Sequence, residues 1–149
     1  MEPVVATVVQ GYKEVHAKLR EAVRGLDGEA LNWKPAPETN SVAVLIVHTV
    51  GSEAEIVRVA SNTPSDRDRD AEFLSEADTP EELVRRLDAA DALLDDLAPN
   101  ISAEDLGAVR ARGNREPQEV LWMLVSNYGH AREHLAHIEL TKQMHEARR

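Results

Sequence analysis

The sequence predicts an all-α fold, a four-helix bundle with long connections, and three observations support this class. Apolar residues recur at steps of three and four along four separate segments, a spacing that places them on one face of a helix. Connections of roughly 10 to 20 residues join these segments, and no unit of about 20 to 50 residues repeats, which argues against a solenoid. Because 149 residues is the usual size of one domain, we expect a single domain over residues 1–149.

The first helix is predicted to begin near Val5 and to close near Gly28. Its apolar face consists of residues at helical spacing, namely Val5, Val8, Val9, Tyr12, Val15, Leu19, Val23 and Leu26. The two prolines that follow, Pro35 and Pro37, cannot continue a helix. A loop is therefore expected after the first helix.

The second helix is predicted to start at Asn40 or Ser41, either of which can cap it, and to run to about Ala60. Residues 42–50 place apolar side chains on almost every side of the helix, so we expect this helix in the middle of the bundle. The only titratable residue in this apolar half is His48.

The segment from Ser61 to Asp78 is polar, and residues 66–70 alternate in charge without apolar periodicity, which predicts a solvated loop. The third helix then starts at residues 79–82, Thr-Pro-Glu-Glu, which read as a capping box with proline at the first helical position. Its end is expected at residues 99–100, Pro-Asn.

Residues 101–116 are predicted to connect the third helix to the last, with a short turn over residues 103–106. Pro117 is expected to open the last helix, which runs to about Met144. Its buried stripe is predicted to contain Val120, Leu124, Ala131, Leu135 and Ile138.

Composition and charge exclude several classes of function. The net charge of −10, from 27 acidic and 17 basic residues, repels phosphates and anionic lipids, so neither nucleic acid nor a membrane is an expected partner. The chain shows no spanning segment and no secretory signal, so we expect it in the cytoplasm. Because the sequence contains no cysteine, any thiol in its chemistry must come from another molecule.

Three histidines on the last helix point to a metal site. His130 and His134 are one turn apart, so their rings can converge on one ion, and His137 lies on the same stripe. A third ligand must come from another helix, and His48 is suited to that role. The alternative is that these histidines are buried structural residues or pair by chance. A third reading, the H-x-x-E-H pattern of inverted zinc peptidases at residues 130–134, lacks room for a downstream ligand.

The sequence resembles the DinB-like (DinB/YfiT-like) family of metal-binding bundles in several blocks that occur in the right order. These blocks are residues 31–35 (Leu-Asn-Trp-Lys-Pro), the helix start at residues 40–41, residues 48–53 and the terminal helix from His130 to Gln143. The resemblance implies an up-down-down-up four-helix bundle with a divalent metal held by His48, His130 and His134. Zinc is the expected ion, with nickel or iron as alternatives, and relatives often form homodimers.

The resemblance also implies an activity, because the characterised enzymes of the family use bacillithiol or mycothiol. We therefore expect a metal-dependent transferase that joins a low-molecular-weight thiol to an electrophilic small molecule. Candidate residues beside the metal or in the substrate pocket are Ser52, Glu53, Asn127 and His137. Two alternatives stay open: a metal-dependent hydrolase with Glu53 or Glu55 as general base, and a non-catalytic metal-binding module of the stress response.

Overall fold

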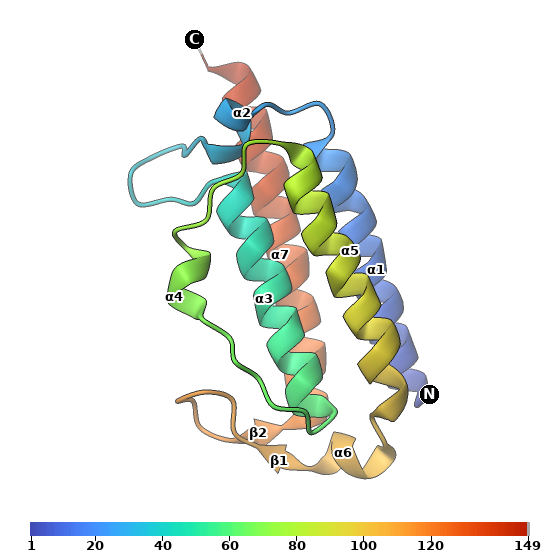
Figure 1. Ribbon diagram of the computed structural model, residues 1–149. Coiled ribbons are helices and arrows are strands. Elements are labelled where there is room, and N and C mark those ends of the chain that lie inside the picture. The colour runs from blue at the N-terminus through green and yellow to red at the C-terminus, as the bar shows by residue number, and fades with distance from the viewer. Residues whose placement is uncertain (149) are drawn as a thin grey trace.

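The computed structural model describes residues 1–148, and within them four long helices form a bundle, which confirms the predicted all-α class (Figure 1). These helices are α1 (Pro3–Val23), α3 (Val42–Ala60), α5 (Pro80–Leu97) and α7 (Val120–Ala147). α1 and α7 run toward one end of the bundle, and α3 and α5 run toward the other (Figure 1). None of the helices in residues 1–148 has the length and apolar character that crossing a membrane requires.

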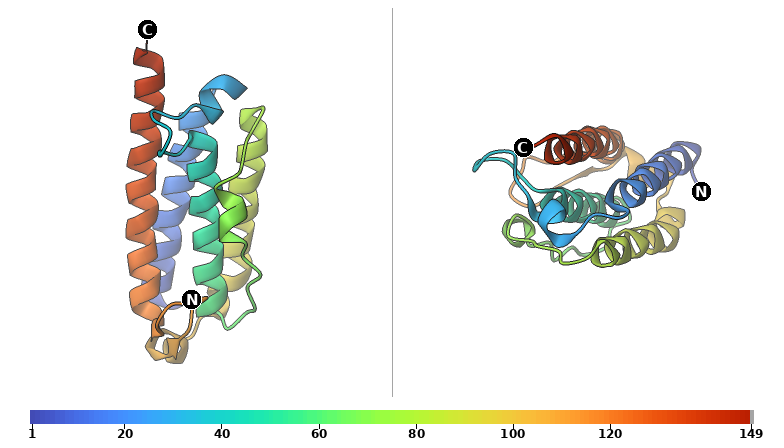
Figure 2. Two further views of the ribbon diagram at one scale, coloured as in Figure 1. Left: turned by 90° about the vertical axis from the view of Figure 1, so that its left-hand side faces the viewer. Right: turned by 90° about the horizontal axis from the view of Figure 1, so that it is seen from above.

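α3 holds the central position that its apolar sequence predicts. It packs against both α5 and α7, whereas α1 closes the bundle on the other side of these two helices (Figure 2). Every residue from Val42 to Val50 is buried, including His48. Because each fully buried Val, Leu or Ile contributes about 1.5–3 kcal/mol, this segment anchors the core and fixes the position of His48.

The first helix ends earlier than predicted. α1 stops at Val23, because Gly25 adopts a left-handed conformation with φ of +73° that a helix cannot include. Asp27 then caps a separate short helix, α2 (Gly28–Asn32), by accepting a hydrogen bond from the Ala30 amide at 2.9 Å. The predicted closure near Gly28 was therefore wrong.

Two of the predicted helix starts differ in detail. Ser41 caps α3, with its hydroxyl accepting from the Val44 amide at 3.1 Å, so Asn40 is not the cap. Pro80 opens α5 as predicted, but the side chain of Thr79 makes no capping bond. The Glu82 carboxylate accepts instead from the Asp78 amide at 3.2 Å, so the predicted capping box was wrong. A capping box occurs at Ser102, before α6 (Ala103–Gly107).

The segment predicted as a solvated loop contains a short helix and two buried charges. α4 (Arg69–Glu72) begins where the Asp68 carboxylate accepts from the Ala71 amide at 3.1 Å. The side chains of Arg67 and Glu72 are only 7% and 9% exposed, because they pair with each other against α3. The solvated-loop prediction was thus wrong for these two residues.

A small hairpin was not predicted, and it changes the start of the last helix. β1 (Val109–Arg110) and β2 (Gln118–Glu119) pair antiparallel, and the Val120 amide donates to the Ala108 carbonyl at 2.9 Å. α7 consequently starts at Val120 rather than at Pro117 and continues to Ala147.

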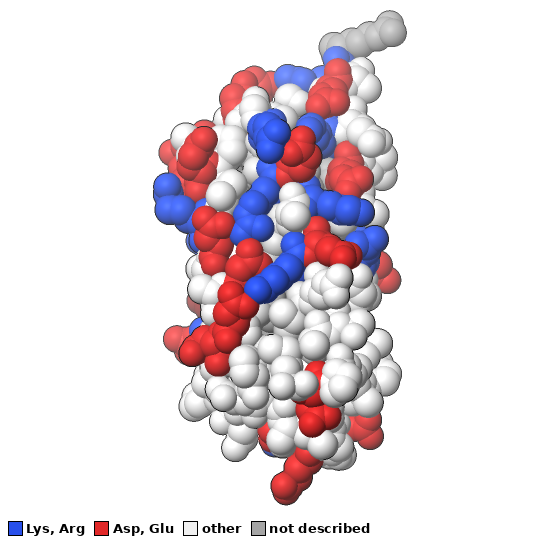
Figure 3. All heavy atoms as spheres, turned by 90° about the vertical axis from the view of Figure 1, so that its right-hand side faces the viewer, with Lys and Arg blue, Asp and Glu red and all other residues white. Residues whose placement is uncertain are grey.

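Charged side chains are unevenly distributed over the face formed by α1 and its neighbours (Figure 3). Lys, Arg, Asp and Glu gather on the upper half of this view, and the lower half is mostly uncharged. The lower half corresponds to the start of α1 and of α7, where residues 3–12 and 120–131 contain no Lys, Arg, Asp or Glu. One end of this face therefore carries few charged side chains, and those that Figure 3 shows there are mostly acidic.

Candidate metal centre

Three imidazoles converge between α3 and α7. One ring nitrogen of each of His48, His130 and His134 lies within 4.8 Å of the other two. The Nε2 atoms of His130 and His134 are 3.0 Å apart, and the His48 ring centroid is 5.5 Å and 5.1 Å from those two rings. The structure therefore brings together the three residues that the sequence predicts as ligands.

The helices explain this convergence. His130 and His134 are four residues apart on α7, so their side chains leave the same face one turn apart. α3 packs along that face of α7 and presents His48, which is 6% exposed, from the other side. The packing of α3 against α7 thus brings all three rings together.

His48 is oriented by a carboxylate that the sequence did not identify. Its Nδ1 lies 3.0 Å from Oε1 of Glu72, which leaves Nε2 as the nitrogen available to an ion. The Phe73 ring packs on the imidazole with 4.9 Å between ring centroids. A carboxylate behind a ligating histidine fixes its tautomer and increases its basicity, and Glu72 is placed for that role.

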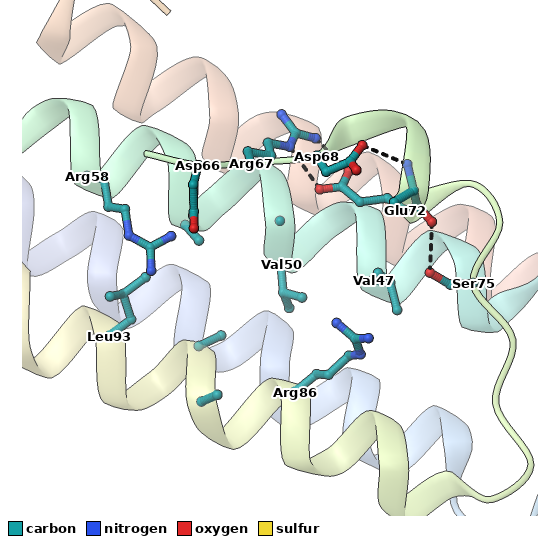
Figure 4. Close-up of a pocket in the computed structure, with 15 residues that line it drawn as sticks. Val47, Val50, Arg58, Asp66, Arg67, Asp68, Glu72, Ser75, Arg86 and Leu93 are labelled. Carbon is teal, nitrogen blue, oxygen red and sulfur yellow. Dashed lines mark hydrogen bonds and ion pairs between the residues drawn. The ribbon is translucent and has the colours of Figure 1, made fainter. Parts of the chain in front are cut away.

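Arg67 and Gly51 hold Glu72 in place. Arg67 donates to both Glu72 oxygens, from Nε at 2.9 Å and from Nη2 at 2.8 Å, and Figure 4 shows the two side chains joined in this way beside α3. A Cβ on residue 51 would lie less than 3.0 Å from the Glu72 carboxylate, and Cβ atoms in proteins essentially never make contacts that short. Glycine at this position therefore lets Glu72 reach His48.

The surroundings favour neutral imidazoles. Burial, together with the charges of His130, His48 and His137, lowers the pKa of His134 from 6.5 to about 4. Burial and the charge of His48 also lower the pKa of His130, and burial lowers that of His48 despite the opposing effect of Glu72. The cluster is thus in the form that binds a metal at neutral pH.

The donor set fits a divalent ion of the zinc type. Zinc binds imidazole nitrogen at about 2.0–2.1 Å, which in a tetrahedral site puts two nitrogens about 3.4 Å apart. The 3.0 Å between Nε2 of His130 and Nε2 of His134 is close to that value. Three protein ligands with a free fourth position is the pattern of catalytic rather than structural zinc sites.

Ser52 and Asn127, predicted near the site, line a cavity of about 290 Å³ that opens beside His48 and His130. The Asn127 amide donates to the Ser52 hydroxyl at 2.8 Å and accepts from the Tyr12 hydroxyl at 2.5 Å. Arg112 donates to the same Ser52 oxygen at 3.0 Å. A buried network from α1, α3 and α7 thus forms the floor of the cavity.

The other two predicted residues occupy different positions. His137 is exposed, with its Nδ1 3.4 Å from Nδ1 of His134, and it lies outside the cluster of three converging nitrogens. Glu53 is 2% exposed, and its carboxylate points into the bundle interior, 2.9 Å from Nε2 of His16. The structure therefore does not bring Glu53 to the cavity, because a five-residue step on α3 turns it away from His48.

Comparison with known proteins agrees with this fold. One solved structure, a conserved protein from Enterococcus faecalis, superposes with a TM-score of 0.72 at 19% sequence identity, over 96% of this chain and 97% of that one. Among curated proteins, none matches. The family model of the DinB superfamily matches residues 12–138, which include all three histidines of the cluster. The chain therefore belongs to the DinB superfamily.

Proposed function

We propose that His48, His130 and His134 hold a divalent metal ion, zinc foremost, with nickel or iron as alternatives. We further propose that the protein is a cytoplasmic transferase that joins a low-molecular-weight thiol of the bacillithiol or mycothiol type to an electrophilic small molecule. The observation that carries this proposal is the convergence of three imidazole nitrogens, within 4.8 Å of one another, at the edge of an open cavity.

The chemistry of the donor set supports a thiol as the substrate. When bound, an ion with three neutral ligands keeps its full positive charge, which lowers the pKa of a nearby thiol well below the free value of about 8.5. The chain contains no cysteine, so no thiol of its own competes for that position. Glu72 orients His48, and Asn127 and Ser52 line the space in which a thiol would lie.

The hydrolase alternative has less support. Its candidate bases are Glu53 and Glu55, but Glu53 faces His16 in the interior. The Glu55 carboxylate accepts from Arg67 at 3.3 Å and from Arg112 at 2.5 Å. Glu53 is committed to His16 and Glu55 to two arginines, whereas a general base needs access to a water molecule beside the metal.

Metal analysis combined with a thiol panel tests the proposal. Untagged protein loaded with zinc is incubated with bacillithiol, mycothiol, glutathione or cysteine and with 1-chloro-2,4-dinitrobenzene. In the reaction the sulfur bonds to the ring carbon, chloride leaves and the thiol proton passes to solvent. We expect one ion per chain and consumption of at least one thiol.

His48→Ala should lose both the ion and the activity, and His145→Ala, at the far end of α7, should keep both. Thiol consumption no faster than in His48→Ala would reject the transferase and leave a metal-binding module. Absence of stoichiometric metal in the wild-type protein would reject the metal centre itself.

We also propose a homodimer, formed through the mostly uncharged half of the face in Figure 3. The start of α1 and the start of α7 lie there, and Val125 on α7 is 50% exposed. A second copy of the chain suits this surface, because two faces with few charges meet with less repulsion than a net charge of −10 causes elsewhere. Val125 and His130 are five residues apart on α7, about 140° around the helix, so pairing through Val125 points away from the histidine cluster.

A further inference from the structure

The cavity beside the histidine cluster is rich in arginine. Its wall carries four of the 17 basic residues of an acidic chain, namely Arg67, Arg69, Arg112 and Arg115. Two of them come from the segment around the start of α4 and two from the hairpin loop between β1 and β2. Two segments far apart in the sequence thus place positive charge at one opening.

Arg67 and Arg112 are fixed in position by the protein. Arg67 pairs with both oxygens of Glu72, and Glu55 accepts from both arginines. Their side chains are 7% and 13% exposed, so little conformational freedom remains to be lost when a ligand binds.

Arg69 and Arg115 differ from Arg67 and Arg112, because neither forms an ion pair within residues 1–148. Arg69 packs its guanidinium over the Phe73 ring at 4.9 Å. The charge of Arg112, more than burial, lowers the pKa of Arg115, which indicates positive charges crowded together. Glu72 and Glu55 balance Arg67 and Arg112. Glu116 is the one acidic residue that lines the cavity within residues 1–148, so Arg69 and Arg115 leave an excess of positive charge.

α7 adds two large apolar side chains to the cavity, next to the polar Ser126, Asn127 and His130. They are Trp122 and Met123, and Trp122 is 55% exposed even though large aromatic side chains are usually buried. An indole surface in the same cavity as a group of arginines suits a molecule with a flat apolar body and an anionic end.

We propose that this cavity binds the anionic group of an organic substrate, a carboxylate or a phosphate, with the apolar part of the substrate against Trp122. Arginine is suited to both groups because its planar guanidinium donates two parallel hydrogen bonds to them. The role of this molecule as a substrate rests on the proposed function, but its binding does not require the metal. The cavity borders His48 and His130, so such a molecule would lie next to the reacting thiol.

NMR titration of the full chain tests this site. The chain has two tryptophans, and the indole N–H signal of Trp122 reports on the cavity, whereas Trp33, which packs against His145, serves as an internal control. Trp33→Phe assigns the two signals. Chelator-treated and zinc-loaded protein are each titrated with benzoate, phenyl phosphate and neutral benzamide at constant ionic strength.

We expect both anions to shift the Trp122 signal saturably, benzamide to leave it in place, and the tighter anion to identify the preferred group. Arg115→Ala should weaken binding at least fivefold, and this exposed residue can be replaced without loss of an ion pair. Arg86→Ala removes the same charge from the exposed surface of α5 and should bind as the wild type does.

Any of three results would overturn the proposal: no saturable shift with either anion, an affinity for benzamide equal to that for the anions, or an anion affinity of Arg115→Ala equal to that of the wild type. Because the titration of chelator-treated protein involves no metal, its outcome is independent of whether the metal centre or the transferase activity is found. Failure of the anion site is thereby distinguishable from failure of the proposed function.

Discussion

The carboxylate of Glu72 occupies the space that a side chain on residue 51 would need, and only glycine at that position lets it contact His48. One Glu72 oxygen lies 3.0 Å from the His48 ring and the other accepts from Arg67 at 2.9 Å. A residue without a side chain thus controls the orientation of a proposed metal ligand on the same helix, less than one turn away.

Gly51→Ala should weaken metal binding. The added methyl group displaces the Glu72 carboxylate, and loss of such a partner behind a ligating histidine costs about 10- to 100-fold in affinity. Competition with a chromophoric chelator measures the change for zinc.

Gly129→Ala is the matched control, because a Cβ added to this helical glycine would meet no other part of the described chain within 4 Å. It should leave zinc affinity unchanged and, through helix propensity, stabilise the fold by about 0.5–1 kcal/mol. Equal zinc affinity in Gly51→Ala and wild type would show that Glu72 does not support the site.

The ligand positions could be predicted from sequence because their signal is local. His130 and His134 are spaced by one helical turn, and His48 interrupts an apolar helix, so periodicity alone places them in the interior. Glu72 and Arg67 lack such a signal. They lie in a run of alternating charges, and local sequence does not distinguish a solvated run from one that docks on another helix.

The same reasoning explains the hairpin and the end of α1. Strands of two residues, such as Gln118–Glu119, are too short to show alternation, so the sequence pattern makes Pro117 resemble a helix start. Leu26 continues the apolar spacing of α1 past Gly25, and apolar spacing alone contains no information on the positive φ of this glycine. The buried pairing of His16 with Glu53 joins α1 to α3, and only the packed bundle reveals it.

The histidine cluster should make the metal-free fold sensitive to acid. The pKa of His134 falls from 6.5 to about 4 on folding, so as pH drops below 6.5 the unfolded chain binds protons first and becomes favoured. The loss of stability grows down to about pH 4. Urea unfolding at about pH 7.5 and pH 5 should show His134→Gln gaining stability relative to wild type at the lower pH. A difference independent of pH would contradict the lowered pKa.

His16 should titrate in the opposite direction. Burial is the largest single influence and disfavours its charged form, but the hydrogen bonds and charges of Glu53 and Asp91 together raise the pKa of His16 above 6.5. Its contribution to stability is therefore complete below pH 6.5 and is lost as pH rises through the folded-state pKa.

Asp91→Asn removes one of these two carboxylates and should lower the pKa of His16, measured by NMR titration of the ring protons. Asp96→Asn, at an exposed site on the same helix, should leave that pKa unchanged. A His16 pKa that is the same in Asp91→Asn as in wild type would assign the whole effect to Glu53.

Val125→Glu should separate the proposed homodimer. The side chain is 50% exposed in a single chain, so the substitution should change the free energy of unfolding of the monomer by no more than about 0.5 kcal/mol. Sedimentation velocity should show a dimer for wild type and a monomer for the variant. Leu74→Glu, at an 83% exposed site after α4, is the control and should remain dimeric. A monomeric wild type, or a dimeric Val125→Glu, would exclude this interface.

Glu55 ties the hairpin to the segment before α4. Its Oε1 accepts from Nη1 of Arg67 at 3.3 Å and from Nε of Arg112 at 2.5 Å, and its side chain is 15% exposed. Glu55→Gln removes the negative charge between two guanidinium groups and leaves them to repel each other.

We expect Glu55→Gln to destabilise the fold by about 1–3 kcal/mol, the range for a buried polar group that loses its partner. Hydrogen exchange of backbone amides should also accelerate in residues 109–119 and stay unchanged in the middle of α1. Glu119→Gln, on the same hairpin but exposed and outside every ion pair of residues 1–148, should alter neither quantity. Equal amide exchange rates in the two variants would show that Glu55 does not hold the hairpin. The strand pairing and Arg110 would then hold it, since Arg110 donates to the Val59 and Ala60 carbonyls at 2.9 Å and 2.8 Å.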